Sequence, residues 1–308
     1  MSINAVKFSG HESFVFRHTW LTKGVTECAK DPGLFRQPNA LVTLGVGKNM
    51  VESIKYWCLA ARVIGQHPEE RYSYQPTQIG EAIFVKDGGW DPYLEDEGTL
   101  WLIHYLLATN AESATTIYYA FNEWSNPDFT STNLYEAIWR LAERLQSKVT
   151  PGTLKRDINV FTRSYVGGRV SSASPMEDTL DCPLADLKLV YEEPLRQTYD
   201  FARGPKDTLP DAVFYYALES YARGQGGRKS FTCDELAYFP LSPGRVFKLD
   251  EAALAERLEH MSPLTGGAWQ ITETAGYRQM IVRQDVDAFE VLQDYYRQRT
   301  RGDANVRD

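Results

Sequence analysis

The chain has 308 residues, of which 43% are hydrophobic and 24% are charged, and its formal net charge is −8. This apolar content excludes a disordered chain, and the length exceeds the usual size of a single domain. The acidic charge excludes a protein that coats nucleic acid with its whole surface, so any contact with DNA must come from local basic patches.

The sequence contains no secretory leader and no apolar stretch of the roughly 18 residues needed to span a bilayer. We therefore expect a cytoplasmic protein without membrane contact. The four cysteines lie far apart and form no C-x-x-C pair, which favours reduced thiols over a disulfide scaffold or a zinc knuckle. They are Cys28, Cys58, Cys182 and Cys233.

The most organised local pattern covers residues 38–64. A short apolar segment, residues 39–44, precedes a glycine-rich turn at 45–47. Residues 48–64 then carry apolar side chains at three- and four-residue spacing, which is typical of an amphipathic helix. Two helices joined by a short turn with glycine predict a helix-turn-helix, whose second helix can enter the major groove of DNA.

The residues after this pattern favour a winged version of the motif. Residues 71–74 alternate as a strand does, and Pro76-Thr77 opens a further short helix over 78–84. The predicted wing covers residues 69–75. The exposed face of the second helix is expected to contact phosphates and base edges, through Lys48, Asn49, Ser53, Lys55 and Tyr56. The alternative is an ordinary helical hairpin inside a core.

A second basic region runs from residue 140 to residue 169. Its seven basic residues stand against Glu143 and Asp157, a local balance of about +5. The three at four-residue spacing are expected to share one helix face and to follow the DNA backbone; they are Arg140, Arg144 and Lys148. The alternative is a solvated helix face.

Cleavage of a phosphodiester usually needs carboxylates that hold a divalent metal beside a basic group. The candidate metal ligands are Glu12 and Asp157, with Mg²⁺ or Mn²⁺ as the expected ion. His11 precedes Glu12, and Lys155 and Arg156 precede Asp157, so the predicted catalytic set is Glu12, His11, Asp157, Lys155 and Arg156. The alternatives are a turn at 11–12 that binds its own backbone and a salt bridge on one helix. A weaker candidate is the acidic loop with Asp91, Glu95 and Asp96.

We expect a mainly α protein with small β elements. The predicted regions are a winged helix-turn-helix DNA-binding domain over 1–90, a helical middle over 91–170, a C-terminal α+β domain over 171–298 and a frayed tail over 299–308. The α+β domain is compatible with a second winged helix. The serine-rich stretch within residues 167–181 is expected to connect the middle and last domains.

Six strings, in order and spacing, resemble the SspB family of the bacterial Ssp DNA phosphorothioation systems, a family long catalogued as a domain of unknown function. They are FSGHESF at 8–14, LGVGKNMVESIKYW at 44–57, DPYLEDEGTLWLIHY at 91–105, LKRDINVFTRSYV at 154–166, LDCPLADLKLV at 180–190 and SPGRVFKLDE at 242–251. The resemblance implies a DNA-nicking component that acts with a cysteine desulfurase, an ATPase and an ATP-pyrophosphatase-like sulfur-transfer enzyme.

The function implied by this resemblance is strand-specific DNA nicking in a phosphorothioation-based phage defence, and a homodimer is compatible with it. A second hypothesis is a non-catalytic helix-turn-helix adaptor or transcriptional regulator, which the lack of a standard nuclease motif favours. A third is an interaction protein that docks partners on the aromatic-rich residues 101–124.

Overall fold

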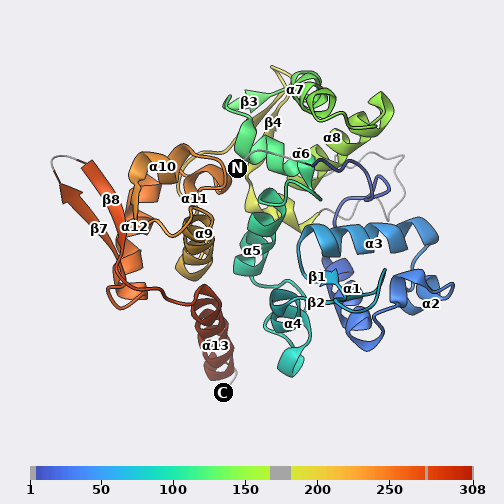
Figure 1. The fold of residues 1–308 in the computed structure, drawn as a ribbon, viewed down its shortest axis with the longest axis horizontal. Helices are drawn as coiled ribbons and strands as arrows, with labels where there is room; N and C mark the ends of the chain where they lie inside the picture. The colour runs from blue at the N-terminus through green and yellow to red at the C-terminus, as the bar shows by residue number, and fades with distance from the viewer. Residues whose placement is uncertain (1–4, 167–181, 275–276, 307–308) are drawn as a thin grey trace. The chain divides into compact units, whose positions relative to one another are not determined.

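The structure, a computed structural model, describes residues 5–166, 182–274 and 277–306. Its internal contacts divide the chain into two compact units, residues 1–202 and residues 203–308. Helices make up most of each unit, and the sheets are small and antiparallel (Figure 1). The predicted fold class, mainly α with small β elements, is therefore confirmed.

The first part of unit 1 alternates short helices with one hairpin. Its elements are α1 (His18–Lys30), the 3₁₀ turn η1 (Leu34–Arg36), α2 (Ala40–Leu44), α3 (Lys48–Ala60), β1 (Ile64–Gln66), β2 (Tyr74–Pro76), α4 (Gln78–Phe84) and the 3₁₀ turn η2 (Lys86–Gly88). Helix α2 ends because Gly45 takes a left-handed conformation, with φ of 65°, that glycine adopts without steric cost. The predicted pair of helices with a glycine turn is thus present.

The hairpin after α3 occupies the place predicted for the wing. Strand β1 pairs antiparallel with β2, with Ile64 opposite Pro76 and Gln66 opposite Tyr74. Helix α3 ends at Ala60, four residues before the predicted end, since Arg62 adopts a positive φ of 54° and the chain turns into β1. Figure 1 shows α1, α2, α3 and this hairpin gathered together in unit 1.

The second part of unit 1 is built around α5 (Glu97–Ala108), in which every residue from Gly98 to Ala108 is buried. A helix that is apolar on all sides belongs in the centre of a fold. The surrounding elements are α6 (Thr115–Tyr118), the π-helical turn η3 (Tyr119–Glu123), β3 (Asp128–Phe129), α7 (Ser131–Arg144), α8 (Pro151–Val166), the 3₁₀ turn η5 (Pro183–Leu187), β4 (Val190–Glu193) and β5 (Thr198–Phe201).

The boundary between the units differs from the expected one near residue 171. Strand β5 pairs with both β3 and β4, so the segment 190–201 completes a sheet of unit 1. The turn η5 comes directly before β4 in the chain. The serine-rich connection at 167–181 lies outside the described residues.

Unit 2 combines helices with one three-stranded sheet in the order β6-β8-β7. Its elements are α9 (Asp211–Arg223), β6 (Ser230–Thr232), α10 (Cys233–Tyr238), α11 (Pro243–Val246), α12 (Glu251–Leu264), β7 (Trp269–Thr274), β8 (Tyr277–Val282) and α13 (Ala288–Val306). Helix α13 continues through most of the tail that was predicted to be frayed. Among the helices of the described residues, none has both the length and the apolar character to cross a membrane.

Candidate functional site

The N-terminal segment, residues 8–16, joins the helix-turn-helix region to the helical middle of unit 1. On one side, the Ser53 hydroxyl of α3 donates to the carbonyl oxygen of His11 at 3.0 Å, and the Trp57 indole donates to that of Phe14 at 3.2 Å. On the other side, the backbone N–H of Ser9 donates to Asp157 of α8 at 2.9 Å. The segment therefore ties α3 to α8.

Asp157 is the centre of this arrangement and is 6% exposed. Its Oδ1 accepts from the Ser9 N–H and from His11 Nε2, the latter at 2.6 Å, and its Oδ2 accepts from the Thr116 hydroxyl. Residues 146 positions apart are thus brought together. A buried carboxylate needs such donors, because removing it from water is otherwise costly.

The hydrogen bonds also fix the tautomer of His11. Its Nδ1 accepts the backbone N–H of Ser13 at 3.1 Å, so the ring carries its proton on Nε2 and donates it to Asp157. Both ring nitrogens are engaged within the protein. In this geometry His11 holds the N-terminal segment in place and has no free nitrogen with which to accept a proton from water.

Tyr56 closes the same buried cluster from α3. Its ring meets that of His11 edge-on, with centroids 5.4 Å apart. Burial raises the pKa of the Tyr56 hydroxyl well above its ordinary value, and the negative charge of Asp157 raises it further. Gly10 has a φ of +97°, and a Cβ there would lie 2.8 Å from the Tyr56 ring, so only glycine fits this turn.

The predicted catalytic residues are only partly assembled. His11 and Asp157 meet, but Glu12 is exposed, and among the described residues these three do not form a group that could hold a metal ion. Lys155 and Arg156 are exposed while Asp157 is buried, because consecutive residues of a helix point about 100° apart. The expectation that they act on one phosphate beside Asp157 is therefore wrong.

The predicted DNA-contacting face of α3 is also corrected. Lys48 and Asn49 are exposed in its first turn, but Ser53 and Tyr56 are buried, at 0% and 6% exposure, under the N-terminal segment. Lys55 is partly buried and forms an ion pair with Glu52 one turn earlier. Only the first turn of α3 thus offers free polar side chains to a ligand.

Sequence reasoning missed a cluster of basic and aromatic residues in the same part of unit 1. Arg36, at the end of η1, and Arg71, in the hairpin loop, lie over the ring of Tyr72, with their guanidinium carbons 5.8 and 4.7 Å from its centroid. The Tyr72 side chain is 53% exposed. The turn η1, which carries Arg36, contacts both α2 and α3.

The second basic region is split by the end of a helix. Arg140 and Arg144 are both exposed on α7, one turn apart as predicted. Lys148 follows the end of α7, where Gln146 has a positive φ of 53°, so the predicted continuation of one helix face to Lys148 is wrong. Arg169 lies outside the described residues.

The acidic loop forms a cap on α5. The carboxylate of Asp91 accepts the backbone N–H groups of Glu95 and Asp96, at 2.9 and 3.0 Å, and Asp96 caps the first turn of α5 through the N–H of Gly98. These acids therefore satisfy the backbone groups that begin a helix.

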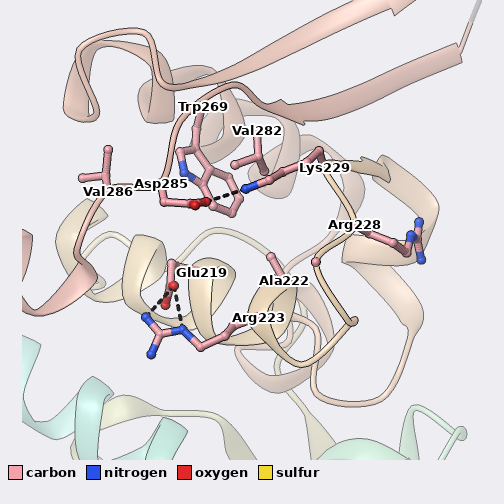
Figure 2. Close-up of a pocket in the computed structure, with 10 residues that line it drawn as sticks. Glu219, Ala222, Arg223, Arg228, Lys229, Trp269, Val282, Asp285 and Val286 are labelled. Carbon is pink, nitrogen blue, oxygen red and sulfur yellow. Dashed lines mark hydrogen bonds and ion pairs between the residues drawn. The ribbon is translucent and has the colours of Figure 1, made fainter.

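Unit 2 contains a cavity of about 380 Å³ between α9 and the sheet strands β7 and β8. Figure 2 shows two pairs of charged side chains in it, Arg223 with Glu219 and Lys229 with Asp285, at 2.6 and 2.5 Å. The other lining cation, Arg228, pairs with Glu235 at 2.8 Å. Because each of these cations has a carboxylate partner, the cavity does not offer them freely to a phosphate.

Comparisons with known proteins agree on one family. The model of a family described as "Protein of unknown function (DUF4007)" matches residues 8–296. A solved structure described as "SspB crystal structure" is 29% identical, with a TM-score of 0.83 over 96% of this chain and 89% of that chain. A second, "Magnesium ion-bound SspB crystal structure", is 30% identical with the same TM-score and coverage. No curated protein matches. The resemblance to SspB inferred from the six sequence strings is confirmed.

Proposed function

The chain belongs to the DUF4007 family of proteins of unknown function, and we propose that it binds DNA and nicks one strand as part of an Ssp-type phosphorothioation system. The observation that carries this proposal is the similarity to SspB over 96% of the chain. In such a system its partners are a cysteine desulfurase, an ATPase and a sulfur-transfer enzyme, and phage defence is the biological role.

We infer that α1 to α4 with the β1–β2 hairpin act as a winged helix-turn-helix. The first turn of α3 presents Lys48 and Asn49, and the hairpin loop presents Arg71 and Tyr72. Basic side chains that lie on a helix N-terminus and a neighbouring loop can contact phosphates on either side of a groove. Local cations of this kind explain how a chain of net charge −8 binds DNA.

A divalent metal belongs to this proposal because one similar structure is described as magnesium ion-bound. The predicted ligands Glu12 and Asp157 do not fit such an ion. Both oxygens of Asp157 already accept hydrogen bonds, and Ser9 N–H and His11 Nε2 direct their hydrogens at Oδ1, where a cation would be repelled. Metal-dependent nicking thus requires other groups, and we assign no ligands.

A supercoiled plasmid tests the proposal. The purified chain is incubated with the plasmid in EDTA, Mg²⁺ or Mn²⁺, alone and with the three partner enzymes. One cut per molecule converts supercoiled plasmid to open circles, whereas two opposed cuts give linear DNA. We expect open circles with a divalent metal and none in EDTA.

A non-catalytic DNA-binding adaptor is the second candidate. The observation that favours it is the internal hydrogen bonding of both His11 ring nitrogens and both Asp157 oxygens, which gives these two residues a structural role. DNA binding without open circles under every one of these conditions selects the adaptor over the nicking protein.

A further inference from the structure

A groove of about 490 Å³ lies between α7 and α8, with Tyr199 of β5 on its wall. We call it the α7–α8 groove. Its volume falls in the range of roughly 300–1,000 Å³ that is usual for sites of small organic ligands. The lining side chains are Ser131, Thr132, Tyr135, Glu136, Lys155, Ile158, Asn159, Thr162 and Tyr199.

The two tyrosines give this groove aromatic surface. Tyr199 stacks on the buried Phe129, with centroids 5.2 Å apart and planes inclined by 26°, so Phe129 supports one face of its ring. Tyr135 stacks on Trp139 one turn along α7, at 5.9 Å and 19°. Rings that are held by a neighbour lose little side-chain freedom on binding, which makes them good stacking platforms.

Three polar side chains of the groove, Lys155, Glu136 and Asn159, have no hydrogen-bond or ion-pair partner among the described residues. Lys155 lies over the Tyr135 ring at 5.8 Å and, within the described part of the chain, forms no ion pair. Glu136 likewise forms none there, and the side-chain amide of Asn159 makes no hydrogen bond to any described residue. This differs from the cavity of unit 2, where Arg223 and Lys229 are already paired.

We propose that the α7–α8 groove binds one unstacked nucleotide of single-stranded DNA. The base lies against the face of Tyr199 that Phe129 leaves free, Asn159 and Glu136 meet the edge of the base, and Lys155 meets the adjoining phosphate. This inference rests on the proposed function, because it names the form of DNA that the nicking protein holds.

The mixture of groups selects a nucleotide over simpler ligands. The unpaired carboxylate of Glu136 lines the same groove as Lys155. Because this carboxylate would repel the negative charge of a phosphate, the groove does not suit phosphate alone. A base, in contrast, offers N–H donors to a carboxylate (the ring N3–H of thymine, or the amino group of other bases), both donors and acceptors to an amide, and a flat face to tyrosine. Enzymes that do chemistry on a base hold it unstacked in a pocket of this kind, by stacking and by hydrogen bonds to its edge.

The test compares single-stranded with duplex DNA for the full-length chain. Fluorescence anisotropy measures affinity for a labelled 12-nucleotide thymidine strand and for a hairpin duplex. We expect Tyr199→Leu and Lys155→Gln each to weaken binding of the single strand by about tenfold and to leave duplex affinity unchanged. The controls are Tyr93→Leu, an exposed tyrosine of unit 1, and Lys229→Gln in unit 2, which should change neither affinity.

A cross-link locates the base directly and does not depend on how well a variant folds. A strand that carries 5-iododeoxyuridine is irradiated with the wild-type chain, and the modified peptide is identified by mass spectrometry. We expect the cross-link at Tyr199 or Tyr135. Cross-links confined to peptides outside α7, α8 and β5 would contradict the proposal that the α7–α8 groove binds the base.

The outcomes separate this inference from the proposed function. If the wild type binds the duplex, and the two groove variants bind the single strand with wild-type affinity, the groove does not bind the nucleotide. The proposed function then still stands. If the wild type binds neither form of DNA, both are wrong.

Discussion

Both units place a helix directly before an antiparallel hairpin, yet the two helices present opposite charges. In unit 1, the first turn of α3 exposes Lys48 and Asn49 ahead of the β1–β2 hairpin. In unit 2, α12 precedes the β7–β8 hairpin and its exposed acids are Glu251, Glu256 and Glu259.

The cations of unit 2 near α12 are also neutralised. Arg278 pairs with Glu259 at 2.7 Å, and Arg257 pairs with Asp211 at 2.8 Å. The exposed acids of α12 would repel phosphate, whereas the exposed Lys48 of α3 would attract it. The two units share the order helix then hairpin. The charge of the exposed side chains on each helix therefore decides whether it can bind an anionic partner.

Each unit contains a carboxylate with several partners, one buried and one partly exposed, and stability measures the difference between them. In unit 1, Asp157→Ala strands three hydrogen-bond donors in a buried site, so we expect a loss of about 3 kcal/mol in unfolding free energy. In unit 2, Asp211→Ala removes the partner of Arg257 and His260, but Asp211 is 35% exposed, so the loss should stay below about 1 kcal/mol. Urea unfolding monitored by circular dichroism measures both. Equal losses of unfolding free energy in the two variants would contradict this difference between the carboxylates.

The reactivity of the cysteine thiols at pH 8 gives a second comparison between the two units. Burial, helped by Asp31, raises the pKa of the Cys28 thiol to about 11, and burial raises that of Cys182 to about 12. A thiol of pKa about 11 is about one part in a thousand thiolate at pH 8, so it reacts about 100-fold more slowly than a thiol of pKa about 9. Cys233 of unit 2 is less buried, although burial raises the pKa of its thiol as well.

We therefore expect iodoacetamide to label Cys233 first in the folded chain and the buried cysteines of unit 1 only after unfolding. Labelling of Cys28 should increase as the pH rises towards its pKa of about 11, because the raised pKa keeps the unreactive thiol form below that value. Peptide mapping over time follows each site. Native Cys28 labelled as fast as Cys233 would contradict the prediction.

The affinity for duplex DNA tests whether the exposed cations of unit 1 contact phosphates. Replacing Lys48 and Arg71 with alanine removes two candidate phosphate contacts, so affinity should fall by about tenfold and the slope of log affinity against log salt should shrink by about 1 to 2 units. The matched control in unit 2 is Lys229→Ala, whose side chain already pairs with Asp285. An unchanged salt slope in the folded double variant would exclude this surface.

The exposed pair on α7 should have a smaller effect. Arg140→Glu with Arg144→Glu reverses two charges on one helix face, and we expect a loss of about threefold to fivefold for every duplex sequence alike, because phosphate contacts carry no base information. Titrations with two unrelated duplexes measure it. A loss confined to one sequence would mean that α7 contacts bases.

Local patterns predicted the elements but not the surfaces that pack over them. The glycine turn, α3 and the hairpin could be predicted from Gly45 and from the spacing of the apolar residues that follow it, because these signals lie close together in the chain. The burial of Ser53 and Tyr56 depends on the N-terminal segment, which covers a second face of α3. A periodic pattern reports one buried face and cannot show that a distant segment covers another.

The same reason explains the mixed outcome for the predicted catalytic residues. His11 and Asp157 were each selected for their own chemistry, and their contact across 146 positions appears only in the fold. Glu12 was selected with His11 as its neighbour, yet the turn at residues 9–13, with positive φ at Ser9, Glu12 and Ser13, leaves Glu12 outside. Arg36 was not selected because its partner Tyr72 is distant in sequence.

Hydrogen–deuterium exchange with and without a duplex tests most directly the claim that unit 1 carries the DNA-binding surface. The full-length chain is exchanged in low salt, and peptides from both units are compared by mass spectrometry. We expect DNA to slow exchange in peptides that cover the first turn of α3 and the β1–β2 hairpin, and to leave α12 and its hairpin unchanged. Slower exchange confined to α12 and the β7–β8 hairpin, with none at α3, would contradict the account.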